Sequence, residues 1–106
     1  HPARGPVFES FVLSEIVKGF LNRGEPAPVY FWRDASGHEV DFIVETERGL
    51  LPVEAKSGQT FASDFLQGMK YWQDLSGRSR AAAALVYGGN QGMMRDGIAV
   101  VPWYRL

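Results

Sequence analysis

Residues 39–57 read EVDFIVETERGLLPVEAKS, and the expected architecture of the whole chain follows from them. On both sides of residues 46–49 apolar and polar side chains alternate, and this central segment ends in Gly49. Alternation with a period of two around a turn is typical of a β-hairpin with one buried face. We therefore expect two antiparallel strands joined at residues 46–49.

One register of this hairpin places the apolar side chains of both strands on a common face. Its opposed apolar pairs are Val44 with Leu51, Phe42 with Val53, and Val40 with Ala55. A slip by one residue would set apolar residues against polar ones throughout, so this register is favoured. The other face then carries Asp41 opposite Glu54, and Glu39 opposite Lys56.

The opposed carboxylates of Asp41 and Glu54 need an explanation, because like charges directly across a ladder destabilise a hairpin. A divalent cation held between the two side chains would remove the repulsion. The alternative is a solvated sheet face that carries acidic residues without a function. The pair alone leaves both interpretations open.

Length and composition indicate one globular domain over residues 1–106. There is no cysteine, which excludes disulfides and thiolate metal sites and is compatible with a cytoplasmic protein. No apolar run approaches the ~20 residues of a membrane span, so we expect no membrane association. The net charge of −1 means that any surface for nucleic acid has to be a local patch.

Two segments have the spacing of amphipathic helices. In residues 6–24 apolar side chains recur every four positions, and Pro6 and Gly24 suit the start and the end of a helix. Residues 61–77 repeat the pattern after Thr60, a candidate N-cap. We expect a helix over each segment.

Strand character recurs outside the hairpin. Residues 29–33 are β-branched and aromatic and predict a strand that precedes it. Residues 81–87, four alanines and then LVY, predict a strand buried on both faces. Residues 90–96 read as a loop and residues 97–101 as a short last strand.

The expected order of elements is αβββαββ. The first three strands form an antiparallel meander, whereas a crossover helix favours a parallel, right-handed pair for the strands on either side of it. The predicted fold class is therefore α/β of the mixed α+β kind, a mixed sheet with a helix on each face.

Some single residues have structural interpretations. His38 is expected to be an exposed turn residue, because one histidine without partners is not a zinc site. The Met93-Met94 pair is expected to fill a gap or to form a mobile surface. The tryptophans are expected in the core, namely Trp32, Trp72 and Trp103.

The predicted layout brings a set of polar residues together. Glu54 and Lys56 are two apart in a strand and share a face, to which Asp41 comes from the neighbouring strand. Glu9 lies on a flank of the first predicted helix that can face the sheet, although a first-turn glutamate often only complements the helix dipole. Hard oxygen ligands suit Mg²⁺ or Mn²⁺, and Lys56 beside them could orient a water or neutralise charge on a phosphate.

Asp41 followed by Glu54-Ala55-Lys56, with Glu9 on a helix before them, resembles the PD-(D/E)xK nuclease superfamily. The resemblance implies a restriction-endonuclease-like αβββαβ core. It also implies metal binding by Asp41, Glu54 and the carbonyl of Ala55. Lys56 would be the catalytic lysine and Glu9 the acid of the first helix.

Gln67 and Tyr71 lie one helical turn apart and share a face. They resemble the Q-x-x-x-Y element of the RecB-like exonuclease branch of that superfamily. The resemblance implies that both side chains contact the substrate.

A further resemblance covers almost the whole chain. The phrases GPVFESFVLSEI, YFWRDASGHEVDFIV, LLPVEAKSG and LVYGG resemble the C-terminal domain, of unknown function, of a large prokaryotic family of AAA+-type ATPases. The resemblance implies an attached ATPase domain as partner, and the start at His1 rather than at a methionine fits a fragment of such a protein. ATP would bind in that other domain alone, since the chain has no G-x-x-x-x-G-K-[ST] loop.

Two functions follow from these resemblances. The domain is a metal-dependent nuclease that hydrolyses phosphodiesters of DNA or RNA, or it is a catalytically silent module with a nuclease fold that acts through the attached ATPase. A complete set of acids and lysine favours the first, and the absence of an evident basic groove favours the second.

Overall fold

The computed structural model describes residues 4–78 and 82–106. Its elements in chain order are α1 (Arg4–Asn22), β1 (Val29–Arg33), β2 (Glu39–Thr46), β3 (Gly49–Lys56), the short 3-10 helix η1 (Ser63–Leu66), α2 (Gln67–Leu75), β4 (Ala84–Tyr87), β5 (Met93–Arg95), β6 (Ile98–Pro102) and a second 3-10 helix, η2 (Trp103–Arg105).

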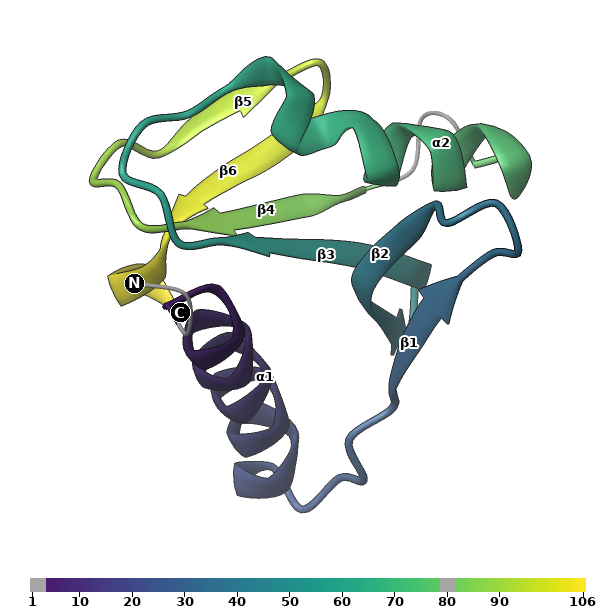
Figure 1. Cartoon of the computed structure of the whole chain (residues 1–106). Coiled ribbons are helices and arrows are strands. Elements are labelled where there is room, and N and C mark those ends of the chain that lie inside the picture. The colour runs from purple at the N-terminus through teal and green to yellow at the C-terminus, as the bar shows by residue number, and fades with distance from the viewer. Residues whose placement is uncertain (1–3, 79–81) are drawn as a thin grey trace.

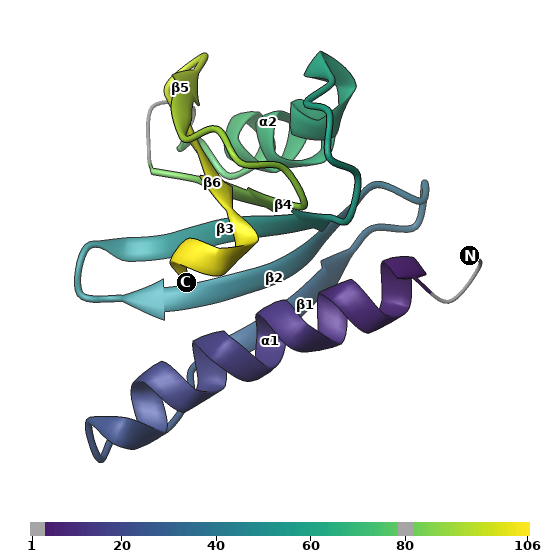
Figure 2. The same cartoon turned by 90° about the vertical axis from the view of Figure 1, so that its left-hand side faces the viewer.

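The six strands form one mixed sheet in the order β1-β2-β3-β4-β6-β5. β1, β2 and β3 are an antiparallel meander, β4 lies parallel to both β3 and β6, and β5 closes the far edge antiparallel to β6. α1 covers one face of the sheet and α2 covers the other, as two views at right angles show (Figures 1 and 2). The predicted mixed α+β fold with a helix on each face is therefore confirmed.

Each helix closes its own hydrophobic cluster against the sheet. On the α1 face Val12 is fully buried and packs in a cluster with Phe42 and Val53. On the α2 face Met69 and Leu85 are fully buried. Burial of side chains of this size contributes about 1.5–3 kcal/mol each, so both faces hold the sheet together.

The end of α1 follows the sequence prediction. Gly24 has a φ of 72°, and its N–H donates to the carbonyl of Leu21 at 2.9 Å. The next N–H, of Glu25, donates to the carbonyl of Phe20 at 3.0 Å. This pair of bonds is the Schellman arrangement that a glycine just after a helix allows.

The hairpin of β2 and β3 has the predicted register over its first half. The pairing runs from Thr46 with Gly49, next to the turn, to Phe42 with Val53. At the turn the Thr46 hydroxyl donates to the carbonyl of Gly49 at 2.7 Å and accepts the N–H of Arg48 at 3.2 Å.

Beyond Phe42 the predicted pairing is wrong. The regular ladder stops there, and the expected pairs of residues 39–41 with residues 54–56 are absent from the register. The reason is a β-bulge in β2, because Tyr30 pairs with Ile43 while Trp32 pairs with Val40, which leaves two residues of β2 opposite one of β1. Val40 is thereby turned to the α2 face, away from the face of Phe42.

Two other boundaries differ from the predictions. The second helical segment begins at Ser63 with η1, and its N-cap position is Ala62 rather than Thr60. The predicted loop at residues 90–96 contains β5, which the two-residue turn Asp96-Gly97 joins to β6. Both turn residues have positive φ, 52° and 79°, as tight hairpin turns require.

The remaining strand predictions hold within the described residues. Leu85, Val86 and Tyr87 of β4 are buried between the two clusters, as expected for a central strand. Ala81, the expected first residue of this strand, lies outside the described part of the chain. None of the helices in residues 4–78 and 82–106 combines the length and the apolarity needed to span a bilayer.

The tryptophans and the methionine pair divide between core and surface. Trp72 is buried as predicted, and Trp32 is half-buried against the α2 cluster. Trp103 is 41% exposed, which contradicts the prediction, because it follows the last strand and packs edge-on against Phe11 of α1. Met93 is half-buried on edge strand β5, whereas Met94 is exposed.

Candidate active site

Two carboxylates replace the backbone hydrogen bonds that are missing where the β2–β3 ladder ends. The N–H of Ala55 donates to Oδ2 of Asp41 at 2.9 Å. In the opposite direction, the N–H of Asp41 donates to Oε1 of Glu54 at 3.1 Å. Each carboxylate therefore accepts a hydrogen bond from the backbone of the neighbouring strand. The two hydrogen bonds run in opposite directions, and this crosswise pair holds both carboxylates where the ladder ends.

The fold determines this arrangement from both sides of the sheet. The bulge in β2 includes Asp41, which directly follows the end of the β2–β3 ladder at Phe42 and Val53. On the α2 side Gly68 packs closely: a Cβ there would lie 2.6 Å from the carbonyl oxygen of Glu39 and 3.6 Å from Oε1 of Glu54. The first turn of α2 therefore closes directly over the carboxylate of Glu54.

Burial and like charge act together on Glu54, which is 6% exposed. Its burial and then the charge of Asp41 raise the pKa of Glu54 to about 8, against a partial opposing effect of Lys56. Burial next to a like charge disfavours the ionised form, so near neutral pH Glu54 keeps its proton.

Glu9 and Lys56 complete the predicted set. Partial burial, followed by the charges of Asp41 and Glu39, raises the pKa of Glu9, and Lys56 works in the opposite direction. Glu9 of α1 lines the same cavity as Asp41. The Lys56 ammonium lies over the ring of Phe65, 5.8 Å from its centroid.

A cavity of about 370 Å³ opens beside Asp41, between α1 and the adjoining ends of β1 and β2. Its walls carry carboxylates from Glu9, Glu39 and Asp41, while Glu54 lies outside the lining and accepts the N–H of Asp41. The full lining consists of Glu9, Phe31, Trp32, Arg33, Glu39, Val40 and Asp41. The sequence prediction did not include Phe31, which stands opposite the bulge in β2.

The Gln67 and Tyr71 pair divides between two environments. Gln67 is exposed at the first position of α2, next to Gly68. The Tyr71 ring stacks on His38 with centroids 3.7 Å apart, and burial followed by a hydrogen bond with Asp34 raises its pKa. His38 is exposed, as predicted, but its imidazole also contacts Asp34 at 3.1 Å, so Tyr71 ties α2 to the β1–β2 turn.

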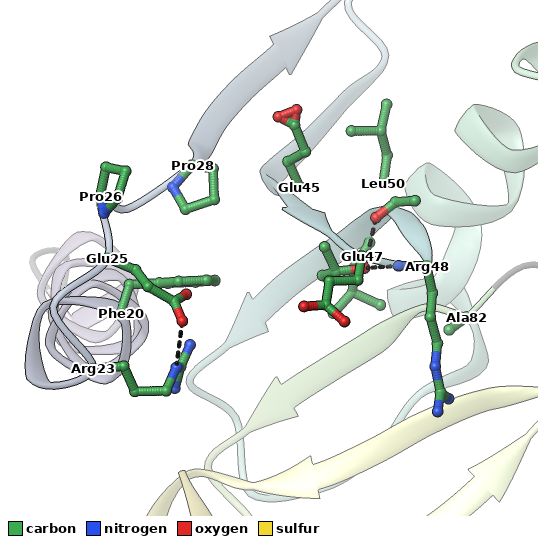
Figure 3. A pocket seen from close by; sticks show the side chains of 13 residues that line it. Phe20, Arg23, Glu25, Pro26, Pro28, Glu45, Glu47, Arg48, Leu50 and Ala82 are labelled. Carbon is green, nitrogen blue, oxygen red and sulfur yellow. Dashed lines mark hydrogen bonds and ion pairs between the residues drawn. The ribbon is translucent and has the colours of Figure 1, made fainter.

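A larger cavity of about 860 Å³ lies at the other end of the hairpin, between the end of α1 and the β2–β3 turn (Figure 3). Phe20, Pro28 and Leu50 contribute to its apolar wall. At its rim Arg23 and Glu25 form an exposed ion pair, with Nε and Oε1 3.6 Å apart. The interlocked carboxylates lie at the smaller cavity, and we therefore place the candidate active site there.

A family model described as Domain of unknown function (DUF4143) matches residues 4–106 of the chain. No curated protein and no solved structure matches this chain significantly. The family description names no activity, so a function has to be inferred from the site itself.

Proposed function

The chain belongs to the family described as Domain of unknown function (DUF4143), and we propose that it is a metal-dependent phosphodiester hydrolase that acts on nucleic acid. The observation that carries the proposal is the crosswise hydrogen bonding of Asp41 and Glu54 where the β2–β3 ladder ends. A pair of like charges away from water destabilises a fold unless a proton or a cation lies between them. A site that brings them together is suited to a divalent cation.

The donors present fit Mg²⁺ or Mn²⁺. Asp41 and Glu54 offer carboxylate oxygens, and the carbonyl of Ala55 points to the same side of β3 as its N–H, toward Asp41. Within residues 4–78 and 82–106 no group of three or more His, Asp or Glu side chains is placed to hold a metal. A small protein contribution of this kind is usual for Mg²⁺, which keeps several waters and takes substrate phosphate as a ligand. The bound metal would lower the pKa of a water and shield the charge of a phosphodiester.

Two further residues have roles in this proposal. Lys56 places a positive charge near Glu54 and Glu9, where it can neutralise charge that develops on the phosphate. Glu9 faces the strand acids from α1 and can accept a hydrogen bond from an attacking water. Gln67, exposed beside Gly68, remains available for a substrate contact.

A second function is favoured by the small number of acidic ligands. Because no group of three His, Asp or Glu side chains among the described residues is placed to hold a metal, the domain could bind a partner instead of cutting a substrate. In that case it would be a nuclease-fold module that acts with an attached ATPase domain outside this chain.

Cleavage assays distinguish the two functions. The protein is incubated with single- and double-stranded DNA and RNA in Mg²⁺ or Mn²⁺, and Lys56→Ala and Asp41→Asn are compared with wild type. We expect each substitution to lower the cleavage rate by about 100-fold or more. Lys18→Ala, which removes an exposed lysine paired with Glu15 on α1, is the matched control and should cut like wild type. No cleavage, or equal cleavage by all variants, would support the second function.

A further inference from the structure

Phe31 is 74% exposed, more than any other large apolar residue in the described part of the chain. It lies on β1, an edge strand of the sheet. An exposed aromatic side chain on an edge strand invites unwanted pairing with other chains, so such positions usually carry charged residues. Its location beside the candidate active site offers a reason for its presence.

The Phe31 side chain is fixed on one side and open on the other. It stands opposite the bulge in β2 and lines the same cavity as Asp41 and Glu9. The ring of Phe42 supports it from the sheet, with centroids 6.1 Å apart and planes inclined by 53°. A supported ring with a free surface is a platform on which a flat, apolar group can stack.

Arg33 lies beside this platform. It is two residues further along β1, so it shares the face of Phe31 and lines the same cavity. Arg33 is exposed, and within residues 4–78 and 82–106 its guanidinium forms no ion pair, although Glu39 stands opposite it in the ladder. An unpaired guanidinium with its planar set of donors is well suited to a phosphate.

We propose that Phe31 and Arg33 form a binding subsite for one unpaired nucleotide, so that the preferred ligand of the domain is single-stranded nucleic acid. The base stacks on Phe31 and a phosphate contacts Arg33. Positions two apart in a strand are separated by about 6.6 Å, which is comparable with the distance between the base and the phosphate of a nucleotide. The cavity volume of about 370 Å³ is adequate for such a ligand.

Stacking on Phe31 discriminates against a duplex. In a double helix each base is stacked between its neighbours and offers no face to a protein side chain, whereas a single strand can turn its bases outward. The catalytic consequence, that the bound strand is cut at Asp41, rests on the proposed function. Binding of the strand does not.

The test measures binding without cleavage. Fluorescence anisotropy of a fluorescein-labelled oligothymidylate and of a labelled hairpin duplex is recorded with the whole chain in EDTA. We expect the wild type to prefer the single strand and Phe31→Ala to weaken that binding about tenfold. Phe31→Trp should retain it, and Arg33→Gln should weaken binding to both ligands. The control is Tyr30→Ala, the neighbouring exposed aromatic residue of the same edge strand, which should bind like wild type.

The outcomes separate this inference from the proposed function. Undetectable binding, equal affinities for the two ligands, or equal effects of Phe31→Ala and Tyr30→Ala would overturn the subsite. Cleavage is not involved, so a protein that binds as expected and never cuts would overturn only the hydrolase proposal. Far-ultraviolet circular dichroism of each variant checks that the fold is intact.

Discussion

Glu54 is buried with its carboxylate against Asp41, and its pKa lies at about 8, above the ordinary glutamate value of 4.5. Between these two values the folded protein keeps a proton that the unfolded chain releases. The unfolded state then binds fewer protons, so the free energy of unfolding decreases as the pH rises through this window. The proposed metal site therefore makes the metal-free fold less stable at slightly alkaline pH.

Glu54→Gln should remove this pH dependence. Glutamine has the shape of the protonated acid, can accept the Asp41 N–H and carries no charge. In EDTA we expect the variant to equal wild type near about pH 5 and to exceed its free energy of unfolding by roughly 1–3 kcal/mol near about pH 8. Urea denaturation at several pH values measures this difference. A variant less stable than wild type at the alkaline end would contradict a raised pKa for Glu54.

Divalent metal should stabilise the protein, and more so as the pH rises. A metal ion competes with the proton on Glu54, so its affinity increases as the pH rises toward the pKa of Glu54. We expect Mn²⁺ to raise the melting temperature by several degrees near about pH 8 and by less near about pH 6. Asp41→Asn should lose the shift, whereas Glu45→Gln, an exposed acid of the same strand, should keep it. An equal shift in both variants would mean that the metal binds elsewhere.

Glu54 and Lys56 could be predicted to share a face because they are two residues apart in one strand. Asp41 could be predicted to lie near them because it belongs to the neighbouring strand. That argument identified Asp41, Glu54 and Lys56. Phe31 was missed, because its place in the cavity depends on the bulge in β2 and no local pattern indicated it.

Among the elements, α2 depends on a glycine for its position. A Cβ at Gly68 would lie 2.6 Å from the backbone oxygen of Glu39, so the helix has to move when alanine replaces glycine. We expect Gly68→Ala to lower the free energy of unfolding by about 1–3 kcal/mol through overpacking. Gly19→Ala in α1 is the matched control, since its nearest neighbour is an arginine tip at 3.8 Å. That variant should gain about 0.5–1 kcal/mol from helix propensity. Destabilisation by both would contradict close packing as the cause.

The stacked pair of Tyr71 and His38 links α2 to the β1–β2 turn. Tyr71→Ala removes the ring contact, and we expect a loss of about 1–2 kcal/mol together with faster amide hydrogen exchange over residues 34–38. Tyr71→Phe should retain most of the stability, because the stacking remains and only the hydrogen bond with Asp34 is lost. Wild-type stability in Tyr71→Ala, with weaker nucleic-acid binding, would instead support the substrate contact that the Q-x-x-x-Y resemblance implies.

Element prediction succeeded where a repeating pattern coincided with a stop signal. α1 ends at Asn22, and Gly24 with its positive φ follows as the expected stop signal. The start of the second helical segment was placed too early, because Phe61 continues the apolar pattern while the chain is still extended at Ala62. Strand β5 has only three residues, too few for alternation to be visible, although the Asp96-Gly97 turn was a usable signal.

The two hydrophobic clusters meet the candidate site from opposite faces of the sheet. Asp41 lines the cavity beside α1, and Glu54 lies under the first turn of α2. The site is therefore assembled only when both helices are docked. The sequence could predict this layered arrangement because the spacing of the apolar residues indicates which face of each helix and strand is buried. It could not predict where the β2–β3 ladder ends, since that depends on how three strands fit together.

At the scale of the whole molecule, the net charge of −1 limits how nucleic acid can bind. Without a basic groove, binding has to rest on a few phosphate contacts, for which Arg33 in the cavity lining and Lys56, whose charge acts on Glu9, are the candidates. Each contact with a single strand contributes about −0.7 to the slope of log affinity against log salt concentration, so we expect a slope near about −1.5. Arg33→Gln should reduce its magnitude by about 0.7, as measured by anisotropy titrations in EDTA at several salt concentrations.

Arg48→Gln provides the control for this measurement. Arg48 is also an exposed arginine on a strand hairpin, but it lines the larger cavity at the far end from Asp41 (Figure 3). Arg48→Gln changes the net charge by the same amount as Arg33→Gln. If binding is confined to the smaller cavity, Arg48→Gln should leave the slope of log affinity against log salt concentration unchanged. Equal reductions in both variants would mean that nucleic acid responds to the overall charge of the domain, and the local subsite would have to be abandoned.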